Sequence, residues 1–172
     1  WTLICEFLWS LASNTMNTNS MKNILTLFIF FYSFCAAAQT ILKFENDIEL
    51  HIMISPFETQ HHQIDTCYFE DQAYICRIDN SNWFGGDHGT ELPKYELVEI
   101  ILYQNNKEIS LDVSQMFNPT FSRRISKRHF EVKVNQNQIE IHGWFSDGAG
   151  FYCAQWVVED GLSIRTLISN RE

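Results

Sequence analysis

A histidine beside an aspartate in a glycine-rich loop is the residue pair in this sequence that offers the most chemistry. His88 follows Asp87 directly, and the stretch from Trp83 to Gly89 carries three glycines. A histidine with an ordinary pKa near 6.5 exchanges protons near neutral pH, and a neighbouring carboxylate can orient its ring. The pair is a candidate general base, so a small secreted hydrolase that uses His88 and Asp87 is one hypothesis for this protein.

The same loop also has the composition of a recognition surface. Trp83 and Phe84 are large aromatic side chains beside an acid and flexible glycines, and aromatic anchors dominate many protein interfaces. We predict Trp83, Phe84, Asp87 and His88 as partner-binding residues. The alternative is structural: Trp83 and Phe84 close one end of the core while the glycines turn the chain. The residue types favour this structural alternative for the two aromatics.

The sequence contains none of the common enzyme signatures. It has no Gly-x-Ser-x-Gly, His-Glu-x-x-His, Cys-x-x-Cys, phosphate-binding or dinucleotide motif. Catalytic groups assemble in space, so this removes positive indications of an enzyme without excluding one. A metal site would draw on His61, His62, His88 and Asp87, but neighbouring histidines on an extended segment point to opposite faces. We therefore predict no metal site and no cofactor.

Cysteine spacing predicts one disulfide in an exported chain. A hairpin with its loop at Asp71-Gln72 places Cys67 opposite Cys76, at a separation that a disulfide can span. Closing so short a loop contributes about 2 to 3 kcal/mol of stability. Cys153 is left over, either as a small buried apolar group or as an alternative partner for Cys67 or Cys76.

Alternating apolar and polar residues predict the strands that position these groups. The stretch from Arg128 to Ser169 is a meander of turn-linked hydrophobic runs, which bury their apolar faces only as neighbouring antiparallel strands. Its loops are expected at Gln136-Asn137 and at Asp160-Gly161, a strong type I′ turn signal. The expected cross-strand pairs are Val134 with Ile139, Val132 with Ile141, Lys133 with Glu140, Glu131 with His142, Val157 with Ile164, and Trp156 with Arg165.

The rest of the chain adds further short strands. We expect strands at Ile41–Phe44 and Ile48–Ser55, a hairpin turning at Asn105-Asn106, a long loop from Ile78 to Pro93, and a crossover from Ser114 to Lys127. The class is therefore all-β, a mostly antiparallel β-sandwich or flattened barrel built from about eight strands in hairpins. The pairs expected around the Asn105-Asn106 turn are Leu102 with Ile109, Ile100 with Leu111, and Val98 with Val113.

The amino-terminal residues predict that a signal peptide is removed from the chain. Residues 1–20 differ from the rest and are interpreted as non-native upstream sequence. Residues 21–38 combine Lys22, an apolar stretch from Ile24 to Phe34 and a small-x-small site at Ala36–Ala38, which is typical of a signal peptide. The apolar stretch is shorter than the roughly 20 residues that span a bilayer. We expect residues 39–172 to form a single periplasmic or secreted β domain without a transmembrane segment, and we expect no lipidation at Cys35.

The net charge and its distribution limit the kinds of partner that we expect the protein to bind. The formal net charge is −9, with acids in excess between Glu58 and Asp112 and bases clustered between Arg123 and Arg128. Nucleic acids and anionic lipids would be repelled at long range. We expect an exported domain that binds a protein without catalysis, as an immunity or inhibitor protein does. The alternatives are the hydrolase above and a cell-surface structural or adhesion module.

Overall fold

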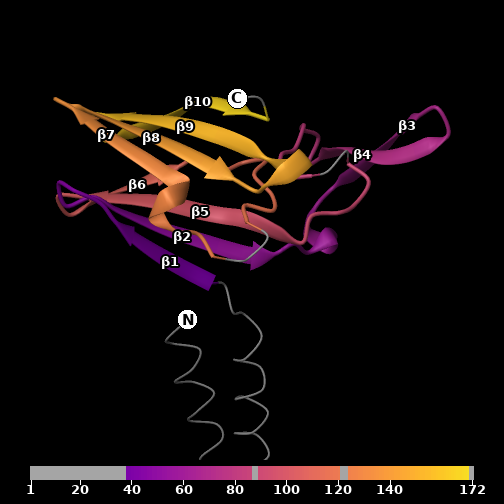
Figure 1. Cartoon of the computed structure of the whole chain (residues 1–172), viewed down its shortest axis with the longest axis horizontal. Helices are drawn as coiled ribbons and strands as arrows, with labels where there is room; N and C mark the ends of the chain where they lie inside the picture. Colours follow the sequence, from indigo (N-terminus) through magenta and orange to yellow (C-terminus); the bar gives the residue numbers. More distant parts are fainter. Residues whose placement is uncertain (1–37, 87–88, 121–123, 171–172) are drawn as a thin grey trace, which may run out of the picture. The chain divides into compact units, whose positions relative to one another are not determined.

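The structure is a computed structural model that describes residues 38–86, 89–120 and 124–170. It confirms the all-β class: two four-stranded antiparallel sheets and one two-stranded hairpin lie in a single compact unit (Figure 1). The ten strands of these residues exceed the eight or so expected. The strands are β1 (Ala38–Lys43), β2 (Glu49–Pro56), β3 (Ile64–Phe69), β4 (Gln72–Ile78), β5 (Tyr95–Gln104), β6 (Lys107–Leu111), β7 (Phe130–Asn135), β8 (Gln138–Phe145), β9 (Tyr152–Glu159) and β10 (Leu162–Ser169), and the 3₁₀ turns are η1 (Thr59–His61), η2 (Lys127–His129) and η3 (Gly148–Gly150).

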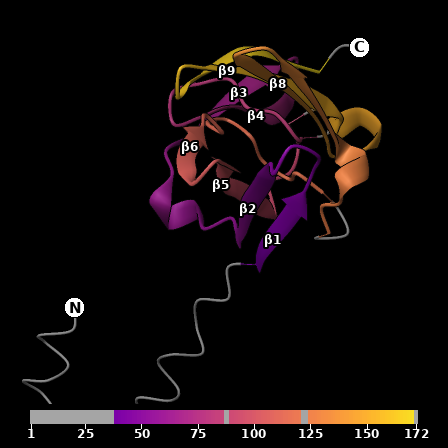
Figure 2. The ribbon, with the colours of Figure 1, turned by 90° about the vertical axis from the view of Figure 1, so that its left-hand side faces the viewer.

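The two four-stranded sheets differ in how local their strand pairing is. One sheet has the order β10-β9-β8-β7, so every neighbour is consecutive in sequence, whereas the other has the order β1-β2-β5-β6. Strand β2 pairs with β5 across the inserted β3–β4 hairpin. Figures 1 and 2 show the two sheets as facing layers, which is the sandwich arrangement. Apart from Ala38, which begins β1, the predicted upstream segment and signal peptide lie outside the described residues.

The register predicted for the carboxyl-terminal meander is confirmed at every pair named above. The turn between β9 and β10 has φ of 51° at Asp160 and 80° at Gly161, the positive values that a type I′ turn needs. Trp156 is fully buried, and its indole N–H donates to the carbonyl of Asp112 at 2.7 Å. Its cross-strand neighbour Arg165 donates to the carbonyl of Ser114 at 2.7 Å. The pair therefore ties β9 and β10 to the chain that leaves the other sheet.

The β5–β6 hairpin is confirmed for two of its three predicted pairs. Leu102 faces Ile109 and Ile100 faces Leu111. The predicted pairing of Val98 with Val113 is wrong, because β6 ends at Leu111 and the chain turns away toward the second sheet. The N–H of Ser114 donates to the Asp112 carboxylate at 2.9 Å, which stabilises this departure.

The core lies between the inner faces of the two sheets. Strand β2 buries alternate residues, and β8 and β9 repeat the same period of two. This packing explains why one-residue slips are disfavoured, since each would move a whole apolar set to solvent. Among the described residues no helix is long and apolar enough to cross a membrane. The buried strand residues of the core are Leu42, Leu50, Ile52, Ile54, Leu97, Ile100, Leu102, Leu111, Phe130, Ile139, Ile141, Phe145, Tyr152, Ala154, Trp156 and Val158.

Candidate partner-binding hairpin

The β3–β4 hairpin projects from the sandwich. Among the described residues neither of its strands pairs with a four-stranded sheet. In Figure 1 its turn lies well beyond the ends of the other strands. A two-stranded hairpin is marginally stable by itself in water, so this element needs other contacts to hold its conformation.

A disulfide joins the two strands of this hairpin. The predicted Cys67–Cys76 bond is confirmed, with a Cα–Cα distance of 5.6 Å, so Cys153 is not the partner of either cysteine. The predicted register is wrong, because the turn lies at Glu70-Asp71 and Cys67 faces Tyr74. Cys76 is the extra residue where the register shifts, and this bulge brings it within bonding distance of Cys67 despite the offset.

The outer end of the hairpin carries two aromatic side chains that the described chain leaves uncovered. Tyr68 is 74% exposed and Phe69 is 71% exposed. Successive strand residues point to opposite faces, so the two rings lie on opposite faces of the hairpin. Their cross-strand neighbours Ala73 and Gln72 are also exposed. Large apolar groups that stand clear on both faces are typical of a binding surface rather than of a solvated turn.

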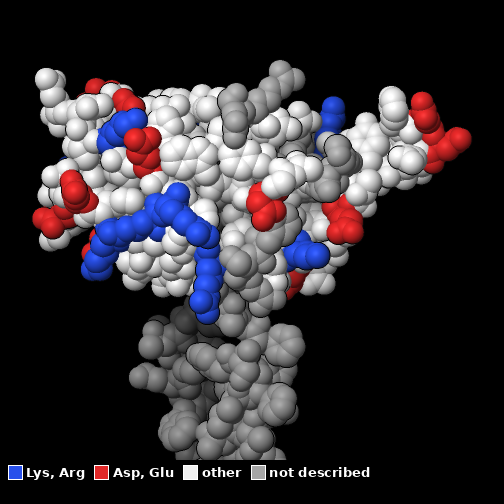
Figure 3. Space-filling model, in the orientation of Figure 1, with Lys and Arg blue, Asp and Glu red and all other residues white. Residues whose placement is uncertain are grey.

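Acidic residues form the turn itself. Glu70 and Asp71 are exposed and connect the two strands. Figure 3 shows the acidic side chains at the outer end of the projection, while a band of basic side chains lies over the region of η2. The exposed bases of this segment are Arg124, which precedes η2, and Lys127 and Arg128 within it. The charges are therefore unevenly distributed, and the aromatic rings are next to the negative end.

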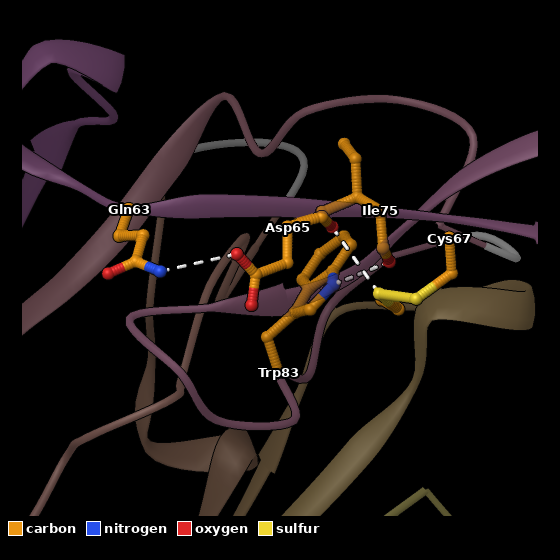
Figure 4. Close-up of a disulfide and its surroundings, with 6 residues drawn as sticks. Gln63, Asp65, Cys67, Ile75 and Trp83 are labelled. Carbon is orange, nitrogen blue, oxygen red and sulfur yellow. Dashed lines mark hydrogen bonds between the residues drawn. A yellow bond between two sulfur atoms is a disulfide. The ribbon is translucent and has the colours of Figure 1, made fainter.

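Trp83 braces the hairpin near its base. Its indole N–H donates to the carbonyl of Ile75 on β4 at 3.1 Å, and its ring packs edge-to-face on Phe117 with centroids 6.1 Å apart. The N–H of Ile75 donates to the carbonyl of Gly89 at 2.6 Å, so both backbone groups of Ile75 are held by the long loop. Figure 4 shows the Trp83 ring near Ile75 and near the disulfide that joins β3 and β4. The loop thus supports the hairpin from one side.

His62 forms a second anchor where the chain enters β3. Its Nδ1 lies 2.7 Å from a carboxylate oxygen of Asp79, and its Nε2 lies 3.1 Å from one of Glu96. The imidazole stacks on Phe57 at a centroid distance of 4.5 Å. Asp79 follows β4, and Glu96 belongs to β5. The ring therefore connects both ends of the hairpin to the first sheet.

The electrostatics of this anchor favour the ionised form of the Asp79 carboxylate. Burial alone would raise the pKa of Asp79, but hydrogen bonds from the His62 ring and from the backbone N–H of Gln63 outweigh it and lower that pKa below its usual value. Because both nitrogens of His62 face carboxylate oxygens, the ring directs neither of them at a substrate. An open cleft of about 510 Å³ includes His62, Asp79 and Glu96 in its lining. The cluster holds strands together rather than presenting a base to this cleft.

Two of the four predicted binding residues lie outside the described residues. Nothing is described for Asp87 and His88, so the hydrolase hypothesis stays a prediction. Phe84 is half-buried against the core: its N–H donates to Gln115, its carbonyl accepts from Phe117, each at 3.0 Å, and its ring lies 6.0 Å from that of Tyr152. These contacts, with those of Trp83, support the structural alternative for the aromatic pair; their role in binding remains a prediction.

The described residues contain no group of three or more histidines, cysteines and acids placed to hold a metal ion. His61 lies exposed, 3.5 Å from Glu58, while His62 is turned inward.

Sequence reasoning did not select Tyr68 and Phe69. The available signal was two adjacent aromatics directly before an acidic turn.

The chain was compared with protein-family models, with curated proteins and with solved structures, and none of the three comparisons finds a match.

Proposed function

We propose that this protein is an exported β domain that binds another protein without catalysis, and that the outer end of the β3–β4 hairpin is the contact. The observation that supports this is the exposure of Tyr68 and Phe69 on a hairpin that is disulfide-linked and anchored at its base. Aromatic anchors in such positions commonly contribute 2 kcal/mol or more to an interface. An immunity or inhibitor protein is the functional class that this arrangement fits.

Three independent restraints reduce the conformational entropy that the hairpin would lose on binding. The Cys67–Cys76 bond crosses the hairpin, Trp83 holds Ile75, and His62 holds the entry to β3. A loop that already has its bound conformation loses less freedom on association. This restraint is a reason to place the contact on the hairpin, since exposed aromatics on a mobile loop would have to be ordered at the interface.

The test compares partner capture by two double variants. In the first, Tyr68→Ser and Phe69→Ser remove both rings. In the second, the matched control, Leu162→Ser and Ile164→Ser change equally accessible apolar residues on β10, which are 73% and 66% exposed. Each is used as bait in an extract of the source cell beside the unchanged protein, and the retained proteins are identified by mass spectrometry.

We expect a partner that the unchanged protein and the β10 control both retain and the hairpin variant loses. Retention of the same partner by the hairpin variant, or its loss only from the β10 control, would place the contact elsewhere. Because all four side chains are mostly exposed, the substitutions should change the melting temperature little, and thermal unfolding of each variant checks this.

A further inference from the structure

We infer that the partner offers a narrow cleft with two apolar walls and basic residues at its floor, into which the β3–β4 hairpin inserts turn first. This inference rests on the proposed function and specifies the chemistry of the partner. It follows from how aromatic and acidic groups are distributed around one end of one hairpin.

The two aromatic rings require a concave surface. Tyr68 and Phe69 are neighbours on β3, so their side chains project from opposite faces of the hairpin. Both are more than two-thirds exposed, so the described part of the chain covers neither face at this end. A flat partner surface would contact one face and leave the other ring in water. Only a cleft buries both rings at once.

The acidic turn sets the charge of the cleft floor. Glu70 and Asp71 join the two strands, so they lead the hairpin into any cleft that receives the rings. Among the described residues neither carboxylate has a hydrogen-bond or ion-pair partner, and both are exposed. Burying a carboxylate against an apolar floor would be unfavourable without a partner. Lysine or arginine side chains at the floor would satisfy the two acids and speed encounter with a chain of net charge −9.

The same features argue against a membrane as the occupant. Exposed aromatic residues also insert into lipid interfaces, but the leading groups here are carboxylates, which anionic membrane surfaces repel. Vesicle binding is therefore a separate outcome of the test.

The experiment places the photo-crosslinking residue p-benzoylphenylalanine at Tyr68, at Phe69 or at Leu162 on β10, one position at a time in the full chain. After irradiation in the source cell, mass spectrometry identifies the cross-linked peptides. We expect positions 68 and 69 to cross-link one protein on two opposing walls of one cleft that has Lys or Arg at its floor, and position 162 to give neither product. Cross-links to different proteins, to one wall or convex surface, or from only one of the two positions would overturn the inference.

A second measurement uses the partner identified by cross-linking and tests whether the floor of its cleft is basic. Glu70→Gln with Asp71→Asn should lower the association rate constant about tenfold at low ionic strength, with the difference nearly lost at 0.5 to 1 M salt, where the Debye length is on the order of 3 to 4 Å. An unchanged rate would overturn the basic floor. Flotation of the protein with phosphatidylcholine vesicles, or with vesicles containing phosphatidylglycerol, would overturn the protein cleft if the aromatic variant abolished it.

Failure of the inference is distinguishable from failure of the proposed function. If the Tyr68→Ser and Phe69→Ser variant keeps its partner, the hairpin is not the contact and both ideas fail. If that variant loses its partner while the cross-links fall on one flat surface, or the charge variant associates normally, the binding function stands and the cleft does not.

Discussion

Gly85 lies in the long loop between β4 and β5. It approaches the segment that connects the two sheets so closely that it can have no side chain. Its φ is +99°, and a Cβ atom added there would lie 1.9 Å from the carbonyl oxygen of Phe117. That carbonyl also accepts the hydroxyl of Tyr152 at 3.1 Å, and the carbonyl of Gly85 accepts the side-chain amide of Asn118 at 2.8 Å. Neither backbone segment can therefore retreat without breaking a hydrogen bond.

The cost of Gly85→Ala follows from these contacts. A non-glycine residue held outside the ordinary backbone regions costs on the order of 1 to 3 kcal/mol. Relieving the overlap breaks one or two partly buried hydrogen bonds, each of which costs about 1 kcal/mol or more. We expect a total of about 3 to 5 kcal/mol. For a domain of this size, about 3 to 5 °C of melting temperature corresponds to each kcal/mol, so the melting temperature should fall by at least about 10 °C.

Gly148 provides the matched control because it shares the positive φ without the contact. Its φ is +53°, and nothing lies within 4 Å of an added Cβ atom. Gly148→Ala should cost about 1 to 2 kcal/mol, the price of the left-handed conformation alone. Thermal unfolding followed by circular dichroism on both variants gives the comparison. Equal melting temperatures for the two variants, or a smaller loss for Gly85→Ala, would refute the close approach of the two segments.

Three further predictions concern the disulfide, the pH dependence of stability and processing. Replacing Cys67 and Cys76 together with serine should remove about 2 to 3 kcal/mol and make the hairpin the first site of proteolysis; unchanged stability and protease resistance would contradict the staple. Asp79 has a lowered folded-state pKa, so the stability it contributes is complete above its unfolded value of about 3.9 and is lost as the pH falls through the lower folded value. The melting temperature should fall in that acidic range, and less in Asp79→Asn; an identical slope in the variant would rule the carboxylate out. Mass spectrometry of the exported protein should find a chain that begins at Gln39, and a form acylated on Cys35 would contradict that processing.

Local patterns in the sequence were sufficient for most of the hairpins. The period of two in the runs around Val132, Ile141 and Val157 indicated which residues are buried together, and Asn105-Asn106 and Asp160-Gly161 fixed where the chain reverses. These features need only short-range information, because a turn and the alternation beside it set the register of the two strands that they join. The Cys67–Cys76 bond was also predicted, although through a register that the bulge at Cys76 replaces.

Only the tertiary structure decided which strands become neighbours across an insertion and which side chains meet there. The pairing of β2 with β5, and the meeting of His62 with Asp79 and Glu96, join positions far apart in sequence, and no local period encodes such contacts. The same holds for the contacts of Trp83: the sequence favoured a structural role for this residue, but only the packing shows that its ring contacts Ile75 and Phe117. Tyr68 continues the alternation of Ile64 and Thr66 along β3, yet it is exposed because no second sheet among the described residues covers the hairpin that carries it.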